Sequence, residues 1–179
     1  KGYHTHHKDV KDRQPFFFSM LFLFLAAMFG LVLSQNLIWI YFFWEITSVI
    51  SFLMIGYTRS DEAVNNSFCA LWMNLLGGLG FAVAIALMAQ MQGTLQLMDV
   101  VGIGALLPLM CLSLAGLTKS AQLPFSTWLL GAMVAPTPSS ALLHSATMVK
   151  AGVYLLIRIS PALEGNLVGI IVSSIGGLT

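Results

Sequence analysis

Charged residues are scarce in this sequence of 179 residues, where they make up 8% against 58% hydrophobic residues. Because about a quarter of the residues in an ordinary soluble domain are charged, the composition excludes a soluble globular protein. Apolar runs long enough to cross a bilayer, about 20 residues each, follow one another with only short gaps. The sequence therefore predicts an all-α, polytopic integral membrane helix bundle without a second, soluble domain.

Residues that commonly bind cofactors or metals are also few. The two cysteines, Cys69 and Cys111, fall within apolar runs, where a free thiol usually behaves as a small hydrophobe. The sequence has no cysteine cluster, no dinucleotide-type glycine loop and no haem ligand pair. The N-terminal His4, His6 and His7 have no acidic or cysteine partners, so we interpret them as part of a solvated loop. We expect no cofactor, no metal site and no catalytic site in this chain.

The polar and apolar runs predict the organisation of the chain. We interpret residues 1–14 as a polar cytoplasmic segment and residues 15–179 as a transmembrane domain, cut from a longer protein, with about five complete spans and a truncated sixth. The spans are expected at 15–33, 37–55, 63–91, 101–134 and 139–157, with the sixth starting near 166. Basic residues near the N-terminus and Arg59 fall on one side, and Arg158 on the other. By the positive-inside rule the first side is cytoplasmic.

The fourth expected span contains a polar interruption. Lys119, Ser120, Gln122 and Pro124 follow an apolar run and precede another. Proline removes a backbone hydrogen bond and clashes with the preceding turn, so we predict that the helix breaks at Pro124. Inside a bilayer, unpaired backbone groups are tolerated only against other protein or a water-filled cavity. A break beside a lysine therefore indicates an internal polar path.

Four ionisable residues lie within apolar runs: Glu45, Lys119, His144 and Lys150. Each costs about 2.5–3.5 kcal/mol or more at the centre of a membrane helix, so each needs an explanation. Burial disfavours the charged forms of lysine and glutamate, which allows both to exchange a proton near neutral pH, and histidine titrates in that range unperturbed. We predict a switchable Glu45 and Lys119 pair, from which protons pass through His144 to Lys150.

A structural role is the alternative for each of these residues. Glu45 and Lys119 could form a buried ion pair that only fixes helix packing. His144 could be a core histidine bonded to a backbone carbonyl. Lys150 lies two turns from Arg158 and could extend its ammonium to the membrane interface.

Two stretches of this sequence resemble a known family. They are KSAQLPFSTWLLGAMVAPTPSSALLHSATMVKAGVYLLIR, from Lys119 to Arg158, and FFWEITSVISFLMIGY, from Phe42 to Tyr57. Both are similar to the antiporter-like, proton-translocating membrane subunits. That family includes the largest membrane subunit of respiratory complex I, the large subunit of Mrp-type cation/proton antiporters, and a membrane subunit of energy-converting hydrogenases and formate hydrogenlyases.

The resemblance implies roles for the same four residues. In the family the glutamate of the WE motif and the lysine of the KSAQ motif form the proton-handling pair, which here are Glu45 and Lys119. His144 matches the bridging histidine and Lys150 the connecting lysine. The fold would be the first half of an inverted-repeat antiporter-like structure with one broken helix. Lys150 favours the Mrp and hydrogenase types over complex I, and the segment from Arg59 favours the hydrogenase type.

The resemblance predicts proton or cation translocation by a membrane subunit of a redox-driven complex, either complex I-like or an energy-converting hydrogenase. One alternative is an Mrp-type Na⁺/H⁺ antiporter subunit, and the other is a purely structural membrane subunit. The expected partners are other membrane subunits, protons or Na⁺, and the lipid bilayer, but no nucleic acid. We expect the protein in the inner (plasma) membrane of a prokaryote.

Overall fold

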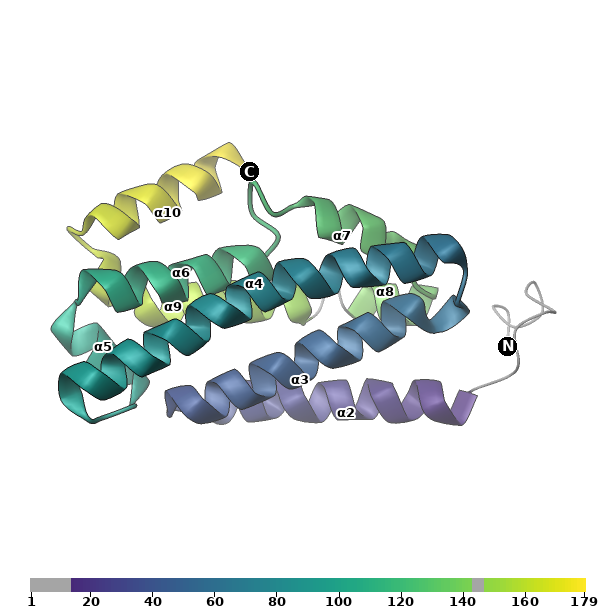
Figure 1. Cartoon of the computed structure of the whole chain (residues 1–179), viewed down its shortest axis with the longest axis horizontal. Helices are drawn as coiled ribbons and strands as arrows, with labels where there is room; N and C mark the ends of the chain where they lie inside the picture. The colour runs from purple at the N-terminus through teal and green to yellow at the C-terminus, as the bar shows by residue number, and fades with distance from the viewer. Residues whose placement is uncertain (1–13, 143–146) are drawn as a thin grey trace.

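The computed structural model describes residues 14–142 and 147–179, except for the side chains of Gln92 and Ile103. Within these residues the chain forms helices and turns and contains no strand (Figure 1). The expectation of an all-α membrane helix bundle is confirmed.

The first half of the bundle consists of three long helices. They are α2 (Gln14–Leu33), α3 (Leu37–Ile55) and α4 (Asp61–Gln92). In the described part of the chain, these three are long and apolar enough to cross a membrane. Helix α3 begins where the Asn36 side chain accepts a hydrogen bond from the Ile38 amide, and α4 begins where the Ser60 hydroxyl accepts one from the Ala63 amide. Such side-chain caps satisfy amides that have no partner within the helix.

The second half consists of shorter helices. After the 3₁₀ turn η1 (Gly56–Thr58) and helix α4, the chain continues through α5 (Leu97–Ile103), α6 (Leu106–Lys119), α7 (Thr127–Gly131), η2 (Ala132–Val134), α8 (Thr137–Ser140), α9 (Met148–Leu163) and α10 (Leu167–Leu178). Helix α7 continues in the direction of α6 after a non-helical segment that contains Pro124 (Figure 1). The number of membrane crossings formed by these shorter helices remains a prediction.

A second interruption, which the sequence analysis did not predict, separates α8 from α9. We expected one continuous helix over 139–157, but α8 ends at Ser140 and α9 starts at Met148. Both the amide and the hydroxyl of Thr147 donate to the Leu142 carbonyl, at 3.1 and 2.7 Å. This bond spans five residues instead of the four of an α-helix, which is the spacing of a π-type turn. Thr147, directly before α9, has a non-helical backbone, with φ at −139° and ψ at −61°.

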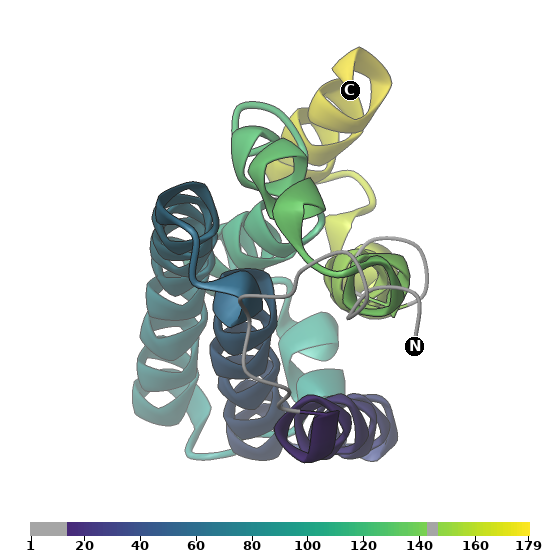
Figure 2. The same cartoon turned by 90° about the vertical axis from the view of Figure 1, so that its right-hand side faces the viewer.

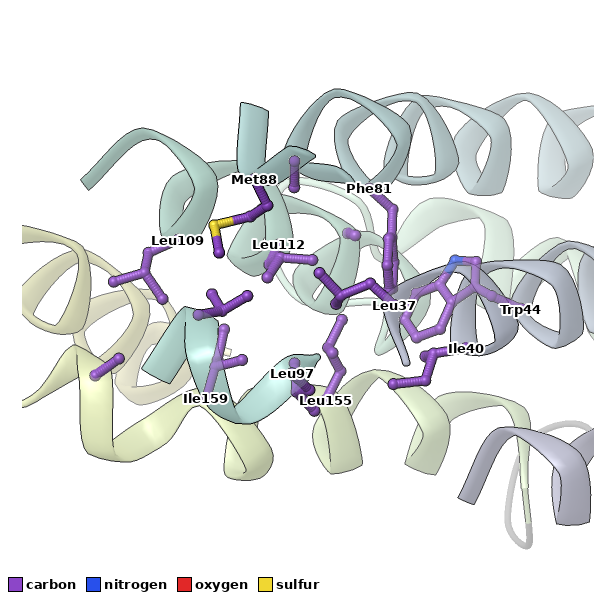
Figure 3. Close-up of a cluster of buried hydrophobic side chains, with 14 of the residues drawn as sticks. Leu37, Ile40, Trp44, Phe81, Met88, Leu97, Leu109, Leu112, Leu155 and Ile159 are labelled. Carbon is purple, nitrogen blue, oxygen red and sulfur yellow. The ribbon is translucent and has the colours of Figure 1, made fainter. Parts of the chain in front are cut away.

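The helices pack in a chain of neighbours: α2 on α3, α3 on α4, α4 on α6, and α6 on α9. Figure 2 shows this arrangement from one end, with α10 at the edge of the bundle. The larger core cluster lies between α3, α4, α6 and α9 and includes Trp44, Phe81, Leu112 and Leu155 (Figure 3). Trp44 and Phe81 are completely buried, and their ring centroids are 5.5 Å apart.

Glycines allow α4 and α9 to approach α6 closely. A Cβ on Gly80 of α4 would lie 3.1 Å from the Cys111 carbonyl of α6. A Cβ on Gly152 of α9 would lie 2.5 Å from the Gly116 carbonyl and 2.6 Å from the Ser120 amide nitrogen, both at the C-terminal end of α6. Small residues are used in this way in membrane proteins because they let two backbones come together. The contact at Gly152 fixes α9 against the end of α6, where Lys119 is located.

Arg158 and Arg59 lie at opposite ends of the bundle. Arg158 donates to the hydroxyl of Tyr154, which donates to the Val32 carbonyl at the end of α2, at 2.8 Å. The start of α2 and the turn that contains Arg59 are at the other end (Figure 1). Arg59 and Arg158 are therefore separated, as the sequence analysis expected, while the polar N-terminal segment with its basic residues and histidines lies outside the described residues up to position 13. Which end faces the cytoplasm remains a prediction.

Candidate functional site

Lys119 is the last residue of α6, and its side chain is 0% exposed. Its ammonium donates to the Trp44 carbonyl at 3.0 Å and to the Ser48 hydroxyl at 2.8 Å, both on α3. The same nitrogen lies 4.8 Å from the centroid of the Trp44 ring. A buried cation must be compensated by hydrogen bonds or opposite charge. Here one turn of α3 supplies the hydrogen bonds and an aromatic face.

The end of α6 is stabilised by bonds to the non-helical segment that follows it. The Gln122 amide donates to the Leu117 carbonyl at 3.0 Å, and the Trp128 indole donates to the Thr118 carbonyl at 3.1 Å. These bonds satisfy carbonyls that a helix leaves without partners at its C-terminus. The partial negative charge of that terminus also favours a cation such as Lys119. Ser120 and Ala121, directly after Lys119, are buried, whereas Leu123 and Pro124 further along the segment are exposed.

Glu45 lies on α3 beside Trp44 and is partly buried. Its Oε1 atom is buried and has no hydrogen-bond partner among the described residues. This oxygen rests against Gly78 of α4, where any Cβ would collide with it. Glu45 also borders a cavity of about 370 Å³ between α3 and α4, together with Tyr41 and Trp72. The glycine thus provides the space that the carboxylate occupies at the edge of this cavity.

The structure brings Glu45 and Lys119 close together, but not as a contact ion pair. Their charges interact electrostatically. Nevertheless, no carboxylate oxygen of a described residue lies within 4.0 Å of the Lys119 nitrogen, whose two hydrogen bonds go to Trp44 and Ser48. The expected pair is therefore present as two neighbouring groups that occupy separate environments.

The other two predicted proton carriers are placed differently. Lys150 lies on α9 with an exposed side chain, at a cavity of about 360 Å³ that Met28 and Phe29 of α2 also line. Its neighbours Ala151 and Gly152 are buried, and Gly152 faces α6. Lys150 and Lys119 share no hydrogen-bond partner in the described part of the chain. His144 lies outside the described residues, so a path from Lys119 to Lys150 remains a prediction.

The sequence analysis did not identify Ser48 or Trp44 as part of this site. Ser48 is three residues after Glu45 and therefore on the same side of α3. That spacing is a signal which sequence reasoning could have used. The Trp44 carbonyl, by contrast, is a backbone group and carries no signal in the sequence.

Residues 34–179 match the family described as NADH:quinone oxidoreductase/Mrp antiporter, transmembrane. The chain therefore belongs to this family of antiporter-like membrane subunits, which confirms the resemblance of the two motif-bearing stretches. The match also supports an integral membrane protein.

Two curated relatives are antiporter subunits. The chain is 42% identical over 179 residues to the putative antiporter subunit mnhA2 of Staphylococcus aureus (strain JH9), covering 94% of this chain and 22% of that protein. It is 40% identical over 186 residues to a probable K(+)/H(+) antiporter subunit of Rhizobium meliloti (strain 1021), covering 99% and 19%. The chain thus spans about a fifth of the length of these relatives.

Two solved structures have a similar fold. The Mrp complex from Dietzia sp. DQ12-45-1b matches with a TM-score of 0.79 and 37% identity, over 86% of this chain and 18% of that one. The archaeal membrane-bound sulfane sulfur reductase matches with a TM-score of 0.69 and 24% identity, over 78% and 30%. At that lower identity the second match shows a shared fold and nothing further.

Proposed function

We propose that this chain is the part of an Mrp-type cation/proton antiporter subunit in which Glu45 and Lys119 handle the proton. Two observations carry the proposal. The ammonium of the completely buried Lys119 donates to two neutral groups, the Trp44 carbonyl and the Ser48 hydroxyl. Glu45, between them on the same turn of α3, has a buried oxygen without a partner among the described residues. The antiporter relatives lead us to prefer this function over the redox-driven hydrogenase type, which the segment from Arg59 favoured.

The separation of the two charges supports proton exchange. When a carboxylate approaches a lysine, both charged forms are stabilised, and when the two move apart inside a bilayer, both neutral forms gain. A small movement of α6 against α3 would therefore change which of the two groups holds the proton. His144 and Lys150 would carry the proton further, and other membrane subunits would supply the remaining path.

The same geometry argues against a purely structural role. A buried ion pair repays its desolvation only when the two charges are in contact and their remaining hydrogen-bonding groups are satisfied. Glu45 and Lys119 are not in contact, and Oε1 of Glu45 has no partner among the described residues. We therefore propose that Glu45 and Lys119 serve to exchange a proton with each other and not to hold the helices together.

Replacing Glu45 by glutamine is expected to stop cation/proton exchange, because the amide cannot accept the proton from Lys119. The complete subunit would be assembled with its partners in everted vesicles that carry a respiration-generated pH gradient. A pH-sensitive dye then reports proton release when Na⁺ or K⁺ is added. We expect at least about a hundredfold loss of the cation-dependent signal, within the range of a missing acid-base group.

The matched control is Asp61→Asn, which removes an exposed acidic residue at the start of α4. The charge of an exposed residue at a helix start contributes little to the stability of the helix. The exchange rate of this variant should therefore stay within about twofold of wild type. Full activity of the Glu45→Gln variant would contradict the proposed role of Glu45. If neither Na⁺ nor K⁺ causes proton release from the vesicles, but an electron donor causes proton uptake, the redox-driven function would be established instead.

A further inference from the structure

The turn of α3 from Trp44 to Ser48 is more polar than a membrane helix requires. The Trp44 carbonyl accepts hydrogen bonds from three side chains: Thr47 at 2.7 Å, Ser48 at 3.1 Å and Lys119 at 3.0 Å. Thr47 and Ser48 are nearly completely buried. The Ser48 hydroxyl donates to this carbonyl and at the same time accepts from Lys119 at 2.8 Å. Ser48 therefore joins the lysine to the helix backbone.

These groups suit a lysine ammonium, which has three hydrogen-bond donors and no acceptor. Two hydrogen bonds go to the Trp44 carbonyl and the Ser48 hydroxyl, and the face of the Trp44 ring lies 4.8 Å from the nitrogen. Aromatic faces attract cations at this distance, and more strongly where water is excluded. Packing against Phe81 holds the ring in place. We call these groups of Trp44 and Ser48 the Trp44–Ser48 site.

We infer that the Trp44–Ser48 site is a second binding position for the Lys119 ammonium, in competition with Glu45, and that Ser48 is the positioning residue that decides between the two. This inference rests on the proposed function, in which Lys119 and Glu45 exchange a proton. Glu45 offers the ammonium a full negative charge, while the Trp44–Ser48 site offers two hydrogen bonds and an aromatic face. Because Glu45 adjoins Trp44 and lies one turn before Ser48, the ammonium can change position without leaving α3.

The competition explains why the lysine is not fixed on the carboxylate. A lysine bound to Glu45 alone would keep both charges and would release its proton slowly. An alternative position of similar stability allows the two states to interconvert, and a small differential interaction then shifts the balance. Removing the Ser48 hydroxyl should move Lys119 onto Glu45. A hydrogen bond to a charged group is strong enough to change such an equilibrium by about tenfold or more.

The test measures how fast the Glu45 carboxyl reacts with dicyclohexylcarbodiimide, an apolar reagent that modifies protonated carboxyl groups. The cavity of about 370 Å³ beside Glu45 gives the reagent access. Labelling would be followed by peptide mass spectrometry on the complete complex in membranes, with Glu45→Gln as the blank. When Lys119 binds Glu45, the carboxylate stays ionised and covered, so labelling slows.

We expect Ser48→Ala to lower the labelling rate at Glu45 by about tenfold. Ser48→Cys has the same branching but only a weak acceptor, so it should act in the same direction and provides a second variant should the alanine variant assemble poorly. Ser48→Thr retains the hydroxyl and should restore the wild-type rate. The matched control is Ser51→Ala, because Ser51 is equally buried on α3 but its hydroxyl bonds to the Ser48 carbonyl and not to Lys119.

Wild-type labelling rates in both the alanine and the cysteine variants would overturn the inference. This result is distinguishable from a failure of the proposed function, because labelling does not require ion transport. If Glu45→Gln stops exchange while the Ser48 variants label like wild type, the proposed function stands and the second position for Lys119 does not exist. If the Ser48 variants label slowly while Glu45→Gln still exchanges ions, the second position stands and the proposed function fails.

Discussion

Replacing Lys119 by arginine is expected to abolish cation/proton exchange even though the positive charge is kept. The arginine guanidinium cannot be deprotonated under any condition that a protein survives, so it cannot pass a proton to Glu45 or onward. We expect at least about a hundredfold lower exchange rate in everted vesicles. If Lys119 supplied only a fixed positive charge, the arginine variant would retain much of the activity.

The arginine variant needs a measurement of assembly, because the lysine is completely buried and a larger side chain strains the packing around it. Native gels of solubilised membranes would show whether the complex forms. Ser113→Ala is the matched control on the same helix. Ser113 is buried and its hydroxyl has no partner among the described residues, so its removal should change neither assembly nor exchange.

Replacing Gly152 by leucine is expected to prevent the assembly of the complex. Even a Cβ at this position would lie 2.5 Å from the Gly116 carbonyl and 2.6 Å from the Ser120 amide nitrogen, and neither backbone atom can rotate away. Helix α9 would have to separate from α6, and the close packing of α9 against the end of α6, where Lys119 lies, would be lost. We expect at least about a tenfold lower amount of complex in the membrane, measured by quantitative immunoblotting of native gels.

Gly102→Ala is the control for a glycine without close neighbours, because the structure has no heavy atom within 4 Å of a Cβ built there. It should assemble in normal amounts. Normal assembly and exchange in the Gly152→Leu variant would show that the close contact between α6 and α9 is not needed for the site.

The long helices were predicted well because they depend on local properties of the sequence. The expected spans 15–33 and 37–55 agree with α2 and α3 to within a residue, since apolar runs of membrane length are bounded there by polar turns. The break predicted at Pro124 falls in the right region: α6 ends at Lys119, a few residues earlier, and Pro124 lies in the non-helical segment that follows.

The features that were missed depend on contacts between distant residues or on backbone groups. The interruption before α9 involves the five-residue bond from Thr147 to Leu142, and no proline or glycine lies between these two residues. The position of Lys119 depends on a carbonyl of α3, 75 residues earlier in the chain. Sequence reasoning paired Lys119 with Glu45 by charge, and it could not weigh a backbone oxygen and an aromatic face as competing partners.

The most direct test of the account is the exchange activity of Lys119→Met in an assembled complex. Methionine keeps much of the length of lysine but carries neither charge nor exchangeable proton. We would measure proton movement with a pH-sensitive dye in everted vesicles, and assembly on native gels of the same membranes. The account predicts a complex that assembles in near-normal amounts and does not exchange cations for protons. An assembled complex that still exchanges them at the wild-type rate would contradict it.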